Sequence, residues 1–368
     1  MDVKIKKGKI LLYRVFDIGS EIDLDKAEAL LADKTHKGRF KLDRKHNMSL
    51  IISSSPLSVN LGTVDVPILD QVVTSELIAK IWHFGTLSLC FQIPITEGLS
   101  WTDLVKTASW IDNDHGIDVI ARSKAVAFQD EIKPAIPSLS NWDTFEDYVT
   151  YFIQEFEGFT EPVSRLGEFA DVPALILAES KEILSDSFKK STVENLHQYS
   201  RDDLVIVDWN SALVVEPSGS MDVPLVIEFA LNQLLEMRYY DDLLDQRLNN
   251  LYNEVVRKNK GIFSNKYKRL AEEAGQIYLE ISEIVENVEN SFKTVGDFYL
   301  ATIFRSTSKR FRFYDWQKSI NEKLSNMAEV SKLLHSEVSE SRSETMELTI
   351  IILIAIEVVP FLYNLFLS

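Results

Sequence analysis

The sequence has a single cysteine and a deficit of positive charge, and both features limit what the protein can be. One cysteine, Cys90, cannot form a disulfide framework, which fits a reducing compartment. Cys90 lies in the alternating run of residues 87–91, so we expect it to be a small buried hydrophobic side chain. With 39 Lys and Arg against 56 Asp and Glu, the net charge of -17 disfavours nucleic-acid backbones, and DNA is not an expected partner.

The sequence also lacks the common catalytic signatures. It has no phosphate-binding loop, no dinucleotide fingerprint, no nucleophile elbow and no zinc motif. The oxygen-rich stretch 112–118 resembles a calcium loop, but Gly116 comes one place early and Ser123 stands where glutamate is needed. We interpret this stretch as a polar turn that caps a helix. The sequence therefore predicts no catalytic residue, no cofactor, no metal site and no enzymatic activity.

The N-terminus carries no recognisable targeting segment, because neither a signal-peptide core nor an acid-poor presequence is present. Residues 1–50 are locally basic, with 12 Lys and Arg against 8 Asp and Glu. This excess is typical of a sheet edge on which lysines prevent unwanted strand pairing. A docking surface for an anionic partner is the alternative.

Residues 1–219 predict a mixed α/β domain. Strands are expected at 9–16, 49–53, 77–83 and 86–93, with Phe84 and Gly85 forming the turn of a hairpin. Asp23 and Ser100 are expected helix N-caps. Further expectations are a loop and possible domain boundary at 134–140, a helix rich in aromatic residues from Asn141, helical structure at 173–190, and a second hairpin over 204–215.

Residues 220–345 predict a long helical bundle or stalk. Apolar residues recur at steps of three and four in three successive stretches, which places each series along one helix face. The series run from Met237 to Val255, from Leu270 to Val295 and from Ile320 to Leu348. Such a stripe is either the buried side of a bundle or a coiled-coil seam between subunits.

Residues 346–368 predict a C-terminal hydrophobic membrane anchor. Sixteen of the 20 residues in 348–367 are apolar, and a helix of that length rises about 30 Å, the thickness of the hydrocarbon core. The alternative is a buried core helix or an oligomer interface. Glu357 and Asn364 share one helix face with Pro360 between them, and we expect this seam to face other copies of the helix in a homo-oligomer.

A run of basic and aromatic residues over 304–316 predicts a patch for an anionic partner. Its basic members are Arg305, Lys309, Arg310 and Arg312. Arginine beside aromatic side chains suits RNA, and near a membrane it suits anionic lipid. An ordinary helix–helix connection whose aromatic residues pack on the core is the alternative.

Three segments together resemble the "required for meiotic nuclear division" family, also called the Rmd and Sad-interacting factor group. They are residues 340–358 with Glu340, Arg342 and Glu347, the aromatic-glycine stretch 82–89, and residues 313–316. Leu348, where family members usually carry tryptophan, and Pro360 depart from the family's pattern. The resemblance implies a membrane-associated homo-oligomer with no recognised catalysis, and the missing presequence suggests a prokaryotic member. Relatives in mitochondria support translation, so the resemblance also implies RNA or a ribosome as a partner.

The expected fold class is α+β, with a mixed α/β N-terminal domain, a long helical bundle or coiled coil, and a C-terminal transmembrane helix. The expected function is a membrane-anchored homo-oligomeric scaffold or tether without catalysis. An oligomeric ion channel with a pore lined by Glu357 is the alternative. The expected location is a prokaryotic inner membrane, or the mitochondrial inner membrane in a eukaryote, with the body in the cytoplasm because no basic residue follows Arg342.

Overall fold

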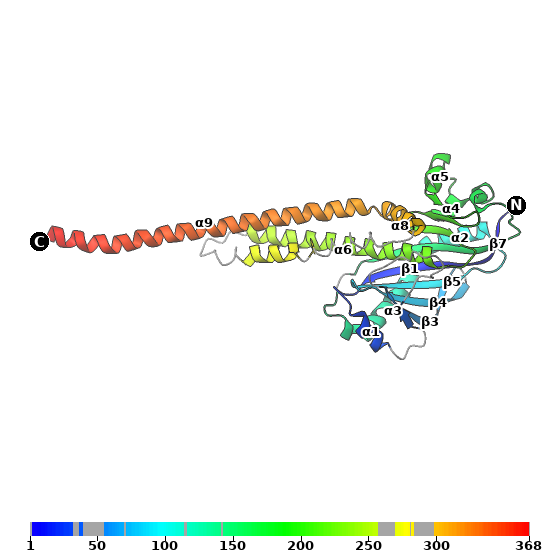
Figure 1. Cartoon of the computed structure of the whole chain (residues 1–368), viewed down its shortest axis with the longest axis horizontal. Helices are drawn as coiled ribbons and strands as arrows, with labels where there is room; N and C mark the ends of the chain where they lie inside the picture. Colours follow the sequence, from blue (N-terminus) through cyan, green and yellow to red (C-terminus); the bar gives the residue numbers. More distant parts are fainter. Residues whose placement is uncertain are drawn as a thin grey trace. The chain divides into compact units, whose positions relative to one another are not determined.

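The structure is a computed structural model of the 368-residue chain. It describes residues 2–31, 37–39, 55–69, 71–113, 116–140, 143–256, 269–279, 281–282 and 298–367. The chain forms two compact units (Figure 1). The first comprises residues 1–239 and 290–314, and the second comprises residues 240–289 and 315–368.

The first unit is built on one mixed sheet, whose described strands run in the order β2-β3-β4-β5-β1-β7-β10-β9-β8, with β6 pairing to β1. All adjacent pairs are antiparallel except β7 and β10, which are parallel. The strands are β1 (Lys4–Asp17), β2 (Lys37–Arg39), β3 (Leu57–Ile68), β4 (Gln71–Ile81), β5 (Thr86–Pro94), β6 (Leu99–Ser100), β7 (Phe145–Glu157), β8 (Leu196–His197), β9 (Leu204–Val207) and β10 (Ser211–Val215).

The described helices occur between and after the strands in the sequence. They are α1 (Leu24–Leu30), α2 (Trp101–Asn113), α3 (Gly116–Ile132), α4 (Val172–Ile176), α5 (Asp186–Val193), α6 (Asp222–Val256), α8 (Phe298–Arg310) and α9 (Phe313–Leu367), with short 3-10 turns at Lys133–Ala135 and Val163–Glu168. The predicted N-caps are confirmed, because the Asp23 carboxylate accepts from Lys26 N at 3.0 Å and Ser100 Oγ accepts from Asp103 N at 3.1 Å.

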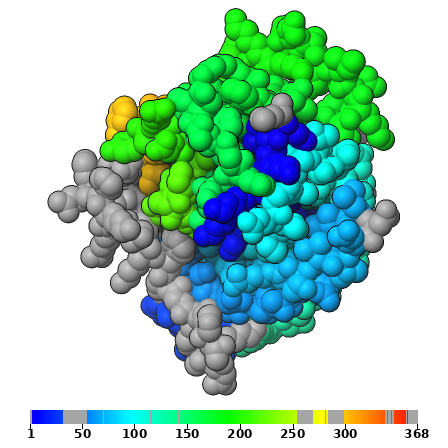
Figure 2. Space-filling view, turned by 90° about the vertical axis from the view of Figure 1, so that its right-hand side faces the viewer, coloured from blue at the N-terminus to red at the C-terminus, as the bar shows by residue number. Residues whose placement is uncertain are grey.

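Strand β1 lies at the centre of the sheet, between β5 and β7, and is buried on both faces over most of its length. Figure 2 shows this order at the surface, where the dark blue N-terminal residues lie between the cyan and green parts of the chain. Because side chains alternate along a strand, β1 sends Leu12 and Phe16 into one core and Leu11 and Tyr13 to the opposite face. The hairpin predicted around Gly85 is confirmed as β4 and β5.

The two faces of the sheet are covered by different helices. Residues of α1, α2, α3 and α4 share one apolar core with Leu87, Leu89 and Phe91 of β5. The N-terminal half of α6 and helix α8 lie on the other face, where Phe229 of α6 packs on Trp82 and on Phe304 of α8, with ring centroids 5.2 and 5.7 Å apart.

The aromatic helix predicted from Asn141 is wrong, because the segment forms strand β7. Tyr148 and Phe152 point to one face of the sheet, while Tyr151 and Ile153 join the core on the other face. A strand covered on both sides has no simple alternation of polar and apolar residues, and its aromatic spacing imitates a helix. The second predicted hairpin is confirmed as β9 and β10. The strand expected at 49–53 lies outside the described residues.

The second unit contains the C-terminal part of α6, residues 269–282 and most of α9. Their buried apolar residues follow the predicted series: Tyr240, Leu244, Leu248, Leu251, Leu270, Ala274, Ile277, Ile281, Ile320, Leu324, Met327 and Leu334. Lys323 of α9 joins α6 through Asp241 and Asp245, with Nζ–O distances of 2.8 and 2.6 Å. The chain therefore has a mixed α+β fold with an N-terminal sheet and C-terminal helices.

Candidate functional site

The face of the sheet beneath α6 carries a polar layer inside an otherwise apolar interface. Alternation along β4 and β5 directs Lys80, Thr86 and Ser88 toward α6. On the helix, Glu228 and Asn232 face these strand residues. They are four residues apart and therefore lie on one helix face.

Every member of this layer has a partner. The Glu228 carboxylate, which is fully buried, accepts from Ser88 Oγ at 2.6 Å and from the Lys80 ammonium. Asn232 Oδ1 accepts from Thr86 Oγ1 at 2.6 Å, and its amide donates to the Glu228 carbonyl at 2.7 Å. A buried charge needs this pairing, because an unpaired one is severely penalised in an apolar interior.

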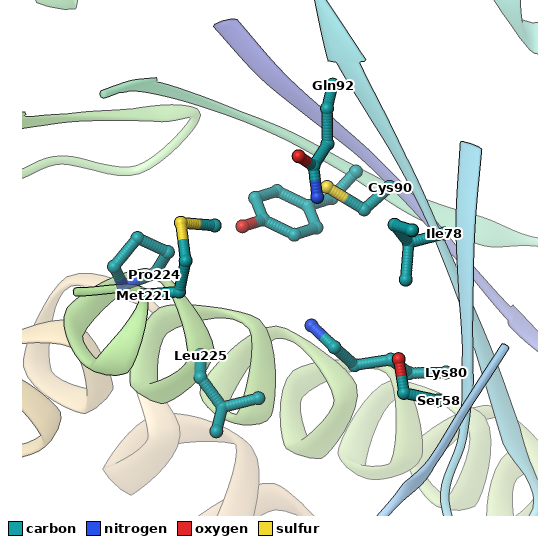
Figure 3. Close-up of a pocket in the computed structure, with 9 residues that line it drawn as sticks. Ser58, Ile78, Lys80, Cys90, Gln92, Met221, Pro224 and Leu225 are labelled. Atoms are coloured by element: carbon teal, nitrogen blue, oxygen red, sulfur yellow. The ribbon is translucent and has the colours of Figure 1, made fainter. Parts of the chain in front are cut away.

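A cavity of about 210 Å³ adjoins the polar layer at the start of α6. Figure 3 shows the amino group of Lys80 and the amide of Gln92 directed into this space. Lys9 Nζ donates to Gln92 Oε1 at 2.8 Å, which leaves the Gln92 NH2 group as the donor that faces the cavity. The lining residues are Tyr13, Ser58, Ile78, Lys80, Cys90, Gln92, Met221, Pro224 and Leu225.

Cys90 and Tyr13 of this cavity are unsuited to nucleophilic chemistry. Burial raises the pKa of the Cys90 thiol to about 12 and the pKa of the Tyr13 phenol well above its usual value. Both groups are therefore protonated at neutral pH, and a thiol in that state is a poor nucleophile. Cys90 is a buried small side chain, as its sequence context predicts. The arrangement suits non-covalent contacts.

No cluster of three or more potential metal ligands occurs among the described residues. Of the calcium-like stretch 112–118, residues 112–113 end α2 and residues 116–118 begin α3. Asp118 is used structurally, because its carboxylate accepts from Arg14 Nε at 2.6 Å.

The seam predicted from Glu357, Pro360 and Asn364 lies on α9, whose backbone stays helical through all three positions. The side chains of these three residues lie outside the described part of the chain, so the seam stays a prediction.

The predicted membrane anchor at 346–368 is wrong. Among the described residues, no helix reaches the combination of length and apolar character that crossing a membrane requires. The uninterrupted apolar run from Ile350 to Ile356 rises only about 10 Å before the charge of Glu357, against roughly 30 Å for a hydrocarbon core. The single-pass membrane location is overturned by the same finding.

Arg310 differs from the other three basic residues of the predicted patch. Arg310 binds within the first unit, where its guanidinium lies 3.5 Å from the Asp208 carboxylate and donates to the Ser191 carbonyl at 3.2 Å. Arg305, Lys309 and Arg312 are exposed. Three aromatic residues of the run, Phe304, Phe311 and Phe313, are buried. This agrees with the alternative interpretation, in which the run is a helix–helix connection whose aromatic residues pack on the core. Binding of an anionic partner to this patch stays a prediction.

Sequence reasoning missed the polar layer beneath α6. Lys80 and Glu228 are 148 positions apart, and neither stands in a recognisable motif. The one available signal is a lysine on the buried side of an apolar strand, and a buried lysine requires a partner.

Comparison with known proteins assigns the family. The family model described as "Uncharacterized protein MJ0711, N-terminal domain" matches residues 7–222, from β1 to the first residue of α6. "Uncharacterized protein MJ0711" of Methanocaldococcus jannaschii is 22% identical over 221 residues, which cover 60% of this chain and 67% of that protein. No solved structure matches. The resemblance to the "required for meiotic nuclear division" family is therefore wrong, and the chain belongs to the MJ0711 N-terminal domain family.

Proposed function

We propose that this protein is a homo-oligomeric scaffold without catalytic activity, whose copies associate through residues 346–358 of α9. We call these residues the apolar segment. In this arrangement the bundle of the second unit carries the segment, and the sheet domain is the part presented to other molecules.

The observation that carries the proposal is the exposure of the apolar segment. Its large apolar side chains are 44–70% exposed in the single chain: Met346, Leu348, Ile350, Ile351, Ile352, Leu353, Ile354, Ile356 and Val358. Because successive helical residues are 100° apart, these side chains surround the helix on all sides. A helix that is apolar all round is normally buried.

The first part of α9 contrasts with this segment, because residues of the second unit already cover it. Ile320, Leu324, Met327 and Leu334 are buried there. The partners of that part include α6 and residues 269–282, as shown by the hydrogen bond from Ser331 Oγ to the Ala271 carbonyl at 3.2 Å. In the single chain, the apolar side chains in the first part of α9 are therefore buried, whereas those of the apolar segment are exposed.

The size of the exposed surface favours another copy as its cover. Nine side chains exposed by about half present roughly 800 Å² per copy, the area that a standard protein interface buries on each partner. At about 25 cal/mol per Å², covering this area is worth on the order of 20 kcal/mol before the entropy of association is subtracted. Identical segments from two or more copies provide matching apolar surfaces without requiring any other partner. An ion pore lined by Glu357 would need a membrane span, and we do not propose one.

The test is the mass of the full-length protein measured by light scattering, beside a version that ends at Ser343. We expect the full-length protein to have a discrete multiple of 42.1 kDa and the shortened version to be a monomer. A double variant, Ile350→Gln with Ile354→Gln, changes one helix face of the segment and is expected to weaken the oligomer.

Val126→Gln is the matched control, because it replaces an exposed β-branched residue on α3 of the first unit. It is expected to leave the mass unchanged. A monomeric full-length protein, or a shortened version with the same oligomeric mass, would overturn the proposal.

A further inference from the structure

A second cavity, of about 270 Å³, lies on the other face of the sheet, and we call it the Tyr151 pocket. The side of β7 that packs on α2 and α4 forms its floor, and the turn between β9 and β10 forms one wall. The lining residues are Ala108, Asp112, Val149, Tyr151, Ile176, Leu177, Ala178, Asp208, Trp209, Asn210 and Ser211. All of them belong to the first unit.

Tyr151 brings an unsatisfied polar group to this pocket. Its side chain is 1% exposed and lines the pocket, and none of the hydrogen bonds found among the described residues involves its hydroxyl. Burial, together with the charge of Asp112, raises the pKa of the Tyr151 phenol well above its usual value, so the hydroxyl stays protonated. Tyr151 and Asp112 both line this pocket. Buried polar groups normally have a partner, so this hydroxyl is suited to contact a ligand.

The rim of the pocket carries uncompensated negative charge. Asp112 forms no ion pair among the described residues, and its pKa is raised by partial burial and by the negative charge of Asp147. Asp112 lies in the last turn of α2, which has no basic residue, so the negative end of the helix dipole adds to the same potential. Asp208 contributes little, because Arg310 lies 3.5 Å from its carboxylate.

Trp209 adds a partly exposed aromatic surface to the lining of the pocket. Its side chain is 43% exposed, and its ring meets Phe311 edge to face with centroids 6.3 Å apart. A partly exposed indole and a carboxylate that line the same pocket suit an organic cation, because the ring face attracts positive charge. Val149, Ile176 and Leu177 give the pocket an apolar floor for the carbon chain of such a ligand.

We propose that the Tyr151 pocket binds a small organic cation, in which an ammonium group contacts Asp112 and Trp209 and a polar atom contacts the Tyr151 hydroxyl. The volume lies just below the usual range of small-molecule pockets, so the ligand has a short carbon chain. This site is independent of the apolar segment, and either proposal can fail without the other.

The test is calorimetric titration of the full-length protein with choline, and with 3,3-dimethylbutan-1-ol as its uncharged isostere. Choline is expected to bind at least about tenfold more tightly, because only the cation is attracted by the Asp112 charge and by the face of the indole ring. Asp112→Asn and Tyr151→Phe are each expected to weaken choline binding by several-fold to about tenfold.

Asp130→Asn is the matched control, because it removes one exposed carboxylate from α3 without touching the pocket. It is expected to leave choline binding unchanged, and thermal melting checks that each variant is folded. Absence of choline binding at millimolar concentration, equal binding of the uncharged isostere, or an equal effect of Asp130→Asn would each overturn the proposal.

Discussion

Replacing Lys80 by methionine removes the positive charge that, among the described residues, pairs with the buried Glu228 carboxylate. In the native protein this carboxylate is fully buried and accepts from the Lys80 ammonium and from Ser88 Oγ. In the Lys80→Met variant, Ser88 is the one of these two donors that still contacts the Glu228 carboxylate. Breaking a buried ion pair on one side typically costs about 3–5 kcal/mol, because the other charge is left uncompensated.

The double variant Lys80→Met with Glu228→Met tests the reason for that loss. Replacing both partners by apolar residues of similar length removes the stranded charge, so the double variant is expected to be more stable than Lys80→Met alone. Urea unfolding followed by circular dichroism measures each free energy of unfolding. Lys6→Met, which breaks an exposed pair with Glu155, is the control and is expected to change stability little.

The reasoning would be refuted if Lys80→Met unfolded at the same urea concentration as the native protein. It would also fail if the losses of the two single variants simply added in the double variant. Either result would mean that Glu228 does not depend on Lys80 for its charge compensation.

Two further predictions concern the loops around Gly19. Burial raises the pKa of Asp17 to about 6, although Ser140 and Gly19 donate hydrogen bonds to it. Because this folded pKa exceeds the unfolded value of about 4, the contribution of Asp17 to stability is present below pH 4 and is lost as pH rises through 6. The loss amounts to about 3 kcal/mol. Asp17→Asn should flatten the pH profile of thermal unfolding between pH 4 and 7, and an unchanged slope would contradict this cause. Gly85→Ala should destabilise the protein by at least about 3 kcal/mol, because φ is +108° and a Cβ would lie 1.8 Å from the Gly19 carbonyl oxygen; a native melting temperature would show that this turn tolerates a side chain.

The sequence predicted those parts of the fold whose signals are local. Strand β5 was predictable because Leu87, Leu89 and Phe91 alternate with smaller residues, and α1 because Asp23 is a strong N-cap. Strand β7 was not predictable in this way. Its two faces are both covered, so its aromatic residues show the spacing of a helix although they form a strand.

The candidate sites depend on contacts that no local pattern carries. Lys80 and Glu228 meet only after β4 is placed against α6, and Tyr151 reaches a pocket whose walls come from α2 and the turn before β10. Composition identified the apolar C-terminal stretch, but it did not distinguish a membrane span from the self-association that we propose. That distinction depends on what covers the helix, and one chain's sequence does not encode its neighbours.

The most direct test of the account is cross-linking of copies through a cysteine placed in the apolar segment. The native Cys90 does not interfere, because it is 2% exposed and burial raises its pKa to about 12. Under mild oxidation, Ile352→Cys is expected to form a disulfide between copies, whereas Val126→Cys on α3 is expected to remain unlinked. If Ile352→Cys stayed as unlinked as Val126→Cys at the same protein concentration, copies of the chain would not associate through the apolar segment, and the scaffold proposal would be contradicted.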